Sequence, residues 1–299
     1  MSNVLRSIYL GGRIVLLPEF NAAGVLQAIE TYKIASVTMV PTMINRIIGL
    51  PLDVFKQFDL SSLKMIISGA SPLPTSSKEW ILKHLPQVEL YEFYGATECG
   101  LISILYPEDQ HRKTRCVGQP VIQTEIRILD ENRNVLPAGE VGEIFIKNLT
   151  TIDSYHNLPE ENKTCFEDEF ITLGDMGRMD EEGYLYIVDR KKEMIISGGV
   201  NIFPREIEDV IMGHPAVQEA AVIGVPDRDW SEQVKAVIEL KPGAEATGRE
   251  IMDYCRERVA DFKTPKSVDF MAELPKTPSG KSLKREIRDE YWKDQEANI

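Results

Sequence analysis

A hydroxyl and a carboxylate stand side by side at Thr97 and Glu98, in the segment YGATE of residues 94–98. The segment 88–93 before it is predicted as a strand, and parallel sheets bind ligands where their strands end. Oxygen ligands suit Mg²⁺ and its phosphate, while Gly95 permits close approach of a ligand. A strand-end turn with a solvated glutamate explains the same residues, so both interpretations stay open.

A second segment of small residues, SGASPLP at 68–74, also follows a predicted strand, at 63–67. Gly69 and Ala70 lack bulky side chains and would let the backbone lie flat against an aromatic ring such as adenine. A tight turn before a helix that begins at Pro74 is the alternative, because proline is well tolerated in the first turn of a helix.

A third group of residues surrounds an acidic and a basic side chain. Asp175 is predicted in a glycine-flanked turn, and Arg190 closes a strand at a predicted domain boundary. The carboxylate could accept both hydroxyls of a ribose, or it could simply cap its own turn. The basic run 190–192 could equally be a solvated hinge. Gly198 and Gly199 either let the backbone contact a narrow ligand or end a strand.

Lys281 follows a turn of Pro, Ser and Gly and is predicted to open the last helix. The residues GKS at 280–282 match the end of a nucleotide P-loop, but that motif needs glycine where Pro275 stands, so it is excluded. A lysine on such a loop is a suitable cation for developing phosphoryl or carboxylate charge. It could also be an ordinary surface charge.

The spacing of apolar residues predicts the elements that position these groups. In the first hundred residues, helical periods alternate with short apolar runs at 35–40, 63–67 and 88–93. Strand, helix, strand in sequence implies parallel pairing with helical crossovers, so this part is predicted to be a partial parallel sheet with helices, of the α/β class.

Two later changes of pattern predict further domains. Alternating runs at 124–130, 142–148 and 183–189, separated by turn signals, predict a small β-rich subdomain. A compact α+β domain follows, with one helix from Pro204 to about Gly213 and another capped by Thr247 and Glu250. The predicted domains are 1–115, 116–190 and 191–299.

Composition excludes several classes of protein. The 299 residues carry a net charge of −13, so nothing global attracts nucleic acid or an anionic membrane. Four distant cysteines indicate a reducing, cytoplasmic compartment rather than a disulfide framework or zinc site. Residues 11–13, GGR, interrupt the first apolar run, and we expect neither a signal peptide nor a membrane-spanning segment.

Taken in order, five segments resemble the adenylate-forming enzymes, in particular their acyl-CoA synthetase branch. They are SGASPLP, YGATECG, TLGDMGR, DRKKEMIISGGVNIFPREIE and LPKTPSGKSLKREI. The resemblance implies a two-step reaction. A fatty or aromatic carboxylate attacks the α-phosphate of MgATP to give an acyl adenylate and pyrophosphate, and the thiol of coenzyme A then displaces AMP. It also implies that the small domain rotates between the steps.

The resemblance implies roles for residues of the first part of the chain. Gly69, Ala70 and Ser71 lie beside the adenine in such enzymes, while Tyr94 and Gly95 flank the adenine and acyl groups. It further implies that position 97 contacts phosphate and that the carboxylate at position 98 holds Mg²⁺.

Residues of the second part receive roles from the same resemblance. Asp175 and Arg190 grip the ribose hydroxyls, and Lys192 matches the hinge position. The glycine pair at 198–199 borders the pantetheine path in the thioester-forming pose. Lys281 supplies the cation for adenylation, contacting carboxylate and α-phosphate oxygens.

One family segment has no counterpart in the sequence: a phosphate-binding loop of the form TSGTTGxPKG. We therefore expect a fragment, a truncated gene product or one piece of a split enzyme, in which the first hundred residues associate with a missing N-terminal half or as a homo-oligomer. The alternatives are a nucleotide-binding or interaction fragment without turnover, and an adenylation enzyme that loads a carrier protein. The absence of a Q-V-K-I-R-G segment favours coenzyme A over a carrier protein.

Overall fold

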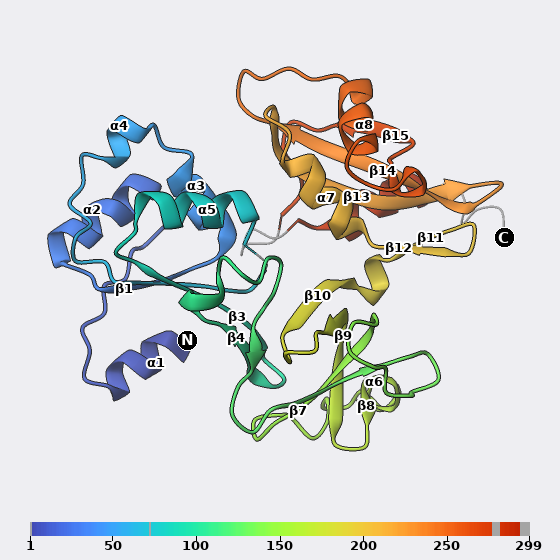
Figure 1. Cartoon of the computed structure of the whole chain (residues 1–299), viewed down its shortest axis with the longest axis horizontal. Coiled ribbons are helices and arrows are strands. Elements are labelled where there is room, and N and C mark those ends of the chain that lie inside the picture. Colours follow the sequence, from blue (N-terminus) through green and yellow to red (C-terminus); the bar gives the residue numbers. More distant parts are fainter. Residues whose placement is uncertain (1, 72, 277–281, 294–299) are drawn as a thin grey trace. The chain divides into compact units, whose positions relative to one another are not determined.

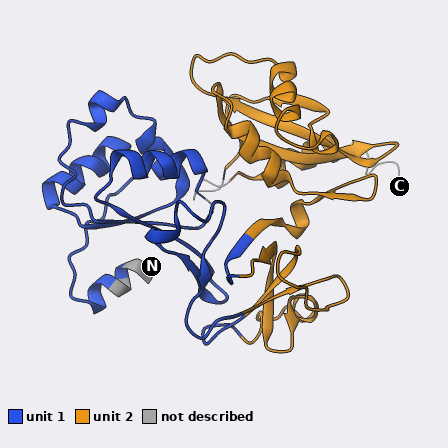
Figure 2. Ribbon diagram, viewed as in Figure 1, with its two compact units in different colours: residues 1–125, 147–152, 182–186 blue, residues 126–146, 153–181, 187–299 orange. Residues whose placement is uncertain are grey.

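The computed structural model describes residues 2–71, 73–276 and 282–293, and the chain packs as two compact units. Unit 1 holds Met1–Glu125, Lys147–Ile152 and Glu182–Tyr186, and unit 2 holds Ile126–Ile146, Asp153–Glu181 and Ile187–Ile299 (Figure 2). The domain boundaries expected at 116 and 191 stay predictions. In the described part of the chain, no helix is long and apolar enough to span a bilayer.

Unit 1 is built on a five-stranded sheet of order β1-β2-β3-β4-β5. The strands are β1 (Ser36–Met39), β2 (Met65–Ser68), β3 (Glu89–Ala96), β4 (Gly100–Leu105) and β5 (Gln119–Pro120). The first three pair in parallel, as the sequence predicts, while β4 pairs antiparallel with both of its neighbours. The α/β class with a partial parallel sheet is therefore confirmed.

Helices α2 to α5 gather on one side of this sheet, and α1 lies on the other (Figure 1). The helices of the unit are α1 (Ser2–Tyr9), α2 (Ala22–Tyr32), α3 (Pro41–Ile48), α4 (Leu52–Phe55) and α5 (Thr75–His84). Helix α2 begins at Asn21, whose side chain accepts the Gly24 amide at 2.8 Å, and it ends at Lys33 in the left-handed conformation. Its Leu26 and Ile29 join the buried core that the helices and β1–β3 share.

The turn between β3 and β4 requires a glycine at position 95. A Cβ on Gly95 would lie 2.4 Å from the carbonyl oxygen of Gly100, closer than real Cβ atoms come to backbone. Residues 94–96 belong to β3 itself, so the expectation that the whole YGATE segment follows a strand is wrong, and only Thr97 and Glu98 lie beyond it. Glycine at position 95 thus allows the backbones of β3 and β4 to approach each other closely in the hairpin.

We expect Gly95→Ala to destabilise the chain by about 2 kcal/mol or more, because the added methyl group forces the two backbones of the hairpin apart. Urea denaturation followed by circular dichroism measures the effect. Gly24→Ala in α2 is the matched control, since its Cβ would come no closer than 3.4 Å to another atom. It should be neutral or stabilising by up to about 1 kcal/mol. Equal stability of the two variants would contradict the packing argument.

A second sheet has the order β10-β9-β7-β6, with β8 paired to β9. Its elements are β6 (Glu125–Leu129), β7 (Gly142–Lys147), β8 (Phe166–Glu167), β9 (Phe170–Met179) and β10 (Leu185–Arg190), with helix α6 (Pro159–Cys165) before β8. The three alternating runs predicted as strands coincide with β6, β7 and β10. This is the expected β-rich subdomain.

The C-terminal part of unit 2 is a third sheet, of order β12-β11-β14-β13, with β15 parallel to β14. Its strands are β11 (Ile195–Ser197), β12 (Val200–Ile202), β13 (Val217–Asp227), β14 (Ser231–Leu240) and β15 (Ser267–Phe270). Its helices are α7 (Pro204–Met212), α8 (Gly248–Arg256) and α9 (Lys284–Trp292). The expected α+β architecture is confirmed.

Both helix starts expected in this part are confirmed. Helix α7 begins at Pro204, and Gly213 directly follows its last residue as the C-cap. Helix α8 has a complete capping box, in which Thr247 accepts the Glu250 amide and the Glu250 side chain accepts the Thr247 amide at 2.7 Å. The last helix was expected to open at Lys281. It begins instead at Lys284, and Lys281 itself lies outside the described residues.

Candidate functional site

The candidate residues fall on both compact units. Those on unit 1 are Gly69, Ala70, Ser71, Tyr94, Gly95, Thr97 and Glu98. Those on unit 2 are Asp175, Arg190, Lys192, Gly198 and Gly199. Lys281 also belongs to unit 2, but its placement is outside the described part of the chain.

The loop after β2 begins with a close contact to an aromatic ring of the protein itself. A Cβ on Gly69 would lie 2.3 Å from the ring of Phe93, so only glycine fits between this loop and β3. The next residue, Ala70, has a φ of 71°, a left-handed conformation that is strained for a residue with a side chain. Ala70 is exposed and Gly69 is buried, so the strained peptide presents its outer face to solvent.

A buried ion pair lies beside this loop. Lys78 of α5 places its Nζ 2.6 Å from Oε1 of Glu92 on β3, and both side chains are less than one tenth exposed. Glu92 pairs in register with Ser68, the residue that precedes the loop. Burial raises the pKa of Glu92, and Lys78 acts in the opposite direction by favouring the carboxylate. The pair was not anticipated from sequence, because the two residues are remote along the chain.

Hydrogen bonds from residues 148–152, which follow β7, hold the turn that carries Thr97 and Glu98. The carbonyl oxygen of Glu98 accepts the Ile152 amide at 2.8 Å, and that of Cys99 accepts both Asn148 Nδ2 and Thr150 Oγ1 at 2.8 Å. These bonds fix the backbone and leave the side chain of position 97 exposed. Sequence analysis missed them because polar residues in a loop give no signal of which backbone they will bind.

The chemistry of these two side chains fits a magnesium ion that is shared with a nucleotide. Mg²⁺ is usually bound in proteins through one or two carboxylates together with substrate phosphates, so one glutamate beside one hydroxyl is a sufficient protein contribution. Within the described residues, no group of three or more His, Cys, Asp or Glu side chains could hold a metal ion by itself. One carboxylate and one hydroxyl can therefore supply part of the oxygen ligands of such an ion.

The sequence predicts Asp175 in a turn, but the residue lies in a distorted part of β9. The register between β7 and β9 shifts at this point, and Gly174 has a φ of 73°. A β-bulge of this kind turns a side chain to a new direction within a strand. The buried Oδ1 of Asp175 lies 3.4 Å from Nε of Arg190, whose own side chain is 61% exposed. The exposed guanidinium of Arg190 can therefore contact a ligand while the carboxylate of Asp175 holds the guanidinium in place.

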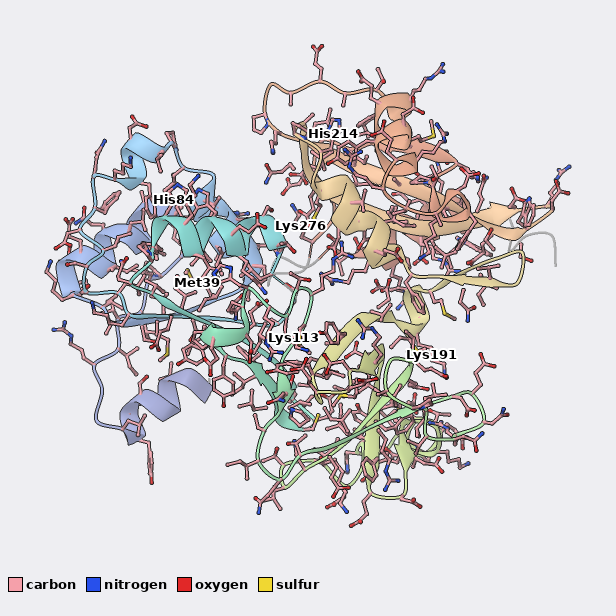
Figure 3. All side chains as sticks on the ribbon, viewed as in Figure 1. Met39, His84, Lys113, Lys191, His214 and Lys276 are labelled. Atoms are coloured by element: carbon pink, nitrogen blue, oxygen red, sulfur yellow. The ribbon has the colours of Figure 1, made fainter. Side chains whose placement is uncertain are left out.

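The two lysines that follow β10 have different surroundings. Lys191, labelled in Figure 3, binds Glu143 at 2.8 Å, and Glu143 also accepts the hydroxyl of Thr172 at 2.9 Å. The next residue, Lys192, is exposed in the short 3₁₀-helix η2 (Lys191–Glu193). One lysine thus fastens the segment to the second sheet, and its neighbour at the expected hinge position projects into solvent.

The glycine pair forms the turn between β11 and β12, and both residues have positive φ values, of 57° and 78°. A Cβ on Gly198 would lie 2.3 Å from the ring of Trp230, and its amide donates to the Trp230 carbonyl at 2.8 Å. A Cβ added at Gly199 would have no other atom within 4 Å. The pair therefore borders an exposed tryptophan that the sequence analysis did not single out.

Family comparisons agree with this arrangement of motifs. A family described as "AMP-binding enzyme" matches residues 1–156, and one described as "AMP-binding enzyme C-terminal domain" matches residues 206–281. The long-chain-fatty-acid–CoA ligase of Bacillus subtilis is 39% identical over 95% of this chain and 50% of its own length. A medium/long-chain-fatty-acid–CoA ligase of Mycobacterium tuberculosis is 36% identical over 96% and 51%. The chain spans about half the length of these curated relatives.

Solved structures show the same likeness. The o-succinylbenzoate CoA synthetase MenE of Bacillus subtilis, in complex with an acyl-adenylate intermediate, has a TM-score of 0.85 and 32% identity over 96% of this chain and 58% of its own. ATP-bound MatB of Rhodopseudomonas palustris has a TM-score of 0.86 and 32% identity over 98% of this chain and 57% of its own. The fold, the ordered motifs and these matches establish that the chain belongs to the AMP-binding, adenylate-forming enzyme family.

Proposed function

We propose that this chain carries the ribose, magnesium, hinge and lysine elements of an ATP-dependent acyl-CoA synthetase, an acid–thiol ligase. The observation that carries the proposal is the 39% identity to a long-chain-fatty-acid–CoA ligase over 95% of the chain. The acid is accordingly a fatty acid, in preference to an aromatic one, and the cosubstrates are ATP and coenzyme A. The free state of all four cysteines supports a cytoplasmic location.

In the first step, a carboxylate oxygen bonds to the α-phosphorus of ATP and the bond to the bridging oxygen breaks, so that pyrophosphate leaves. Attack of one anion on another requires the charge to be neutralised, and Lys281 supplies a cation to the carboxylate and the α-phosphate. Glu98 would hold Mg²⁺, which would supply further neutralisation of the phosphate charge. Thr97 contacts phosphate. No nucleophilic side chain is needed, which agrees with the lack of a catalytic triad motif in the sequence.

The remaining residues bind and orient. Asp175 accepts the ribose hydroxyls, and Arg190 is held beside it. The loop at 69–71 and the strand end at 94–95 flank the adenine. In the second step the thiol of coenzyme A loses its proton and attacks the acyl carbon, AMP leaves, and the pantetheine passes Gly198 and Gly199. Lys192 is the hinge between the two poses.

Association with another chain is part of the proposal. Unit 1 exposes several large apolar side chains near its start, including Ile8, Leu10 and Leu16, each more than 60% exposed. An exposed apolar group of this kind favours association. Its partner is a second copy or a segment equivalent to the half of the curated relatives that this chain does not span.

We expect Asp175→Asn to weaken AMP binding by the 299-residue chain by about 10- to 100-fold, since hydrogen bonds to a charged acceptor are stronger than those to a neutral one. Isothermal titration calorimetry with AMP measures the change. Glu167→Gln is the matched control, because it removes a carboxylate on β8 whose partner is Arg133 at 3.8 Å. An unchanged affinity in the Asp175 variant would contradict the ribose assignment.

Pyrophosphate release separates catalysis from the two alternatives. A synthetase releases pyrophosphate with fatty acids and makes the thioester with free coenzyme A. A fragment that only binds nucleotide holds AMP without consuming ATP, and a carrier-loading enzyme transfers the acyl group to a carrier protein and not to coenzyme A. The assay uses this chain alone and again with the complementary half of a curated relative.

A further inference from the structure

One lysine at the start of α9 lies near three acidic side chains, of which Asp189 and Glu208 are buried and Glu193 is partly exposed. The Nζ of Lys284 is 2.7 Å from Oε2 of Glu193 and 2.8 Å from Oε1 of Glu208, and its side chain is only 15% exposed. Asp189 is the third acid, and the positive charge of Lys284 favours its ionised form. Burial lowers the pKa of Lys284, and the three acids act against burial and raise it.

Two of these acids lie at the two ends of the hinge segment. Asp189 precedes Arg190, and Glu193 is the last residue of η2, so residues 190–192 lie between them. The carboxylate of Asp189 accepts the Arg190 amide at 2.7 Å and the Arg205 amide at 2.8 Å. The Met194 amide donates to the Arg190 carbonyl at 3.2 Å and closes the turn. The backbone at Arg190 is thus held by the Asp189 carboxylate on one side and by the turn that ends at Met194 on the other.

The third acid ties the cluster to the core of the C-terminal sheet. Glu208 of α7 accepts the buried Val222 amide of β13 at 2.7 Å through the same Oε1 that faces Lys284. Burial raises the pKa of Glu208 and of Asp189, so both carboxylates depend on their cation to stay charged. Without the lysine, three acids with buried or partly buried oxygens would repel one another and the hinge segment would lose its attachment.

We propose that Lys284 is a positioning residue: by attracting carboxylates at both ends of the segment 190–192, it fixes the conformation from which Arg190 meets the ribose. The inference rests on the proposed function for the nucleotide, but the geometry it describes does not. A purely structural role, in which Lys284 only holds α9 against α7 through Glu208, is the competing explanation.

The experiment compares Lys284→Gln, Lys284→Arg and Glu193→Gln with the unmodified chain. Glu193→Gln keeps the Lys284–Glu208 pair and removes the ion pair between Lys284 and the end of the hinge segment at Glu193. Hydrogen exchange by mass spectrometry follows the amides of residues 190–194, and calorimetry follows AMP binding. We expect Lys284→Gln and Glu193→Gln to speed exchange in this segment about tenfold and to weaken AMP binding by a similar factor, while Lys284→Arg preserves both.

Lys235→Gln is the matched control for loss of a buried lysine. The Lys235 side chain is 12% exposed and pairs with Asp269 at 2.8 Å, so its removal lowers global stability without touching residues 189–208. The proposal is overturned if Glu193→Gln leaves exchange of residues 190–194 unchanged, or if Lys235→Gln speeds it equally. If the unmodified chain does not bind AMP, the proposed function fails, and the exchange measurement alone decides the role of Lys284.

Discussion

Replacing Lys281 with alanine is expected to lower adenylation of a fatty acid by about 100-fold or more, the scale of losing one donor aimed at transition-state charge. The same change should spare thioester formation from a supplied acyl adenylate, because the resemblance places this lysine at the carboxylate and α-phosphate only in the first step. Pyrophosphate release measures the first step, and thioester formation with coenzyme A measures the second.

Lys266→Ala is the control for this prediction, since Lys266 is an exposed lysine of the same unit. It should leave both half-reactions within about twofold of the unmodified enzyme, as surface substitutions usually do. An equal loss in both half-reactions of the Lys281 variant would contradict the assignment of this residue to adenylation. Full adenylation activity in the variant would remove Lys281 from the site altogether.

Replacing Lys78 with methionine is expected to destabilise the chain by about 3–5 kcal/mol at pH 7.5, the range for breaking a buried ion pair by removing one partner. Glu92 would remain buried beneath the loop at 69–71 with no cation 2.6 Å away. Urea denaturation measures the change. Lys33→Met is the control, because Lys33 and Asp59 form an exposed pair whose loss should change stability far less than loss of the buried pair.

The effect of Lys78→Met should depend on pH in a defined direction. Burial already raises the pKa of Glu92, and loss of Lys78 raises it further, since that lysine favours the carboxylate. A raised pKa in the folded state means that the folded protein binds the proton more tightly, so the stability gained from protonation is present at low pH and is lost as pH rises. The variant should therefore approach the unmodified chain in stability as the pH falls from 7.5 towards 5. A constant difference across this range would show that Glu92 is not the group involved.

The cluster of Lys284 with Asp189, Glu193 and Glu208 illustrates a kind of site that the sequence cannot reveal. Lys284 is 91 residues from Glu193 along the chain, and nothing in the spacing of charged residues distinguishes it from the other lysines. Its three acids are brought together by the packing of α7, α9 and the end of β10. The same holds for Lys78 and Glu92, which lie on a helix and a strand that meet only in the folded sheet.

The local geometry of Asp175 shows a different limit. Its flanking glycines predict a turn, yet the residue lies in β9, where a bulge against β7 places the positive φ at Gly174. Glycine permits both a turn and a bulge, and the choice depends on whether a partner strand is present. Gly69 and Gly95 are similar: the side chain of Phe93 and the carbonyl of Gly100 require them to be glycine.

The sequence by itself determined the family through the order of five motifs, the parallel pairing of β1–β3 through alternating periods, and the starts of α7 and α8 through a proline and a capping box. These features depend on neighbours a few residues away or on long periodic patterns, both of which a linear chain displays. Only the tertiary structure decided the bulge at Asp175, the attachment of the Glu98 turn and the partners of Lys284. Those depend on contacts between distant segments, and burial gives such contacts their strength by removing the water that would otherwise compete.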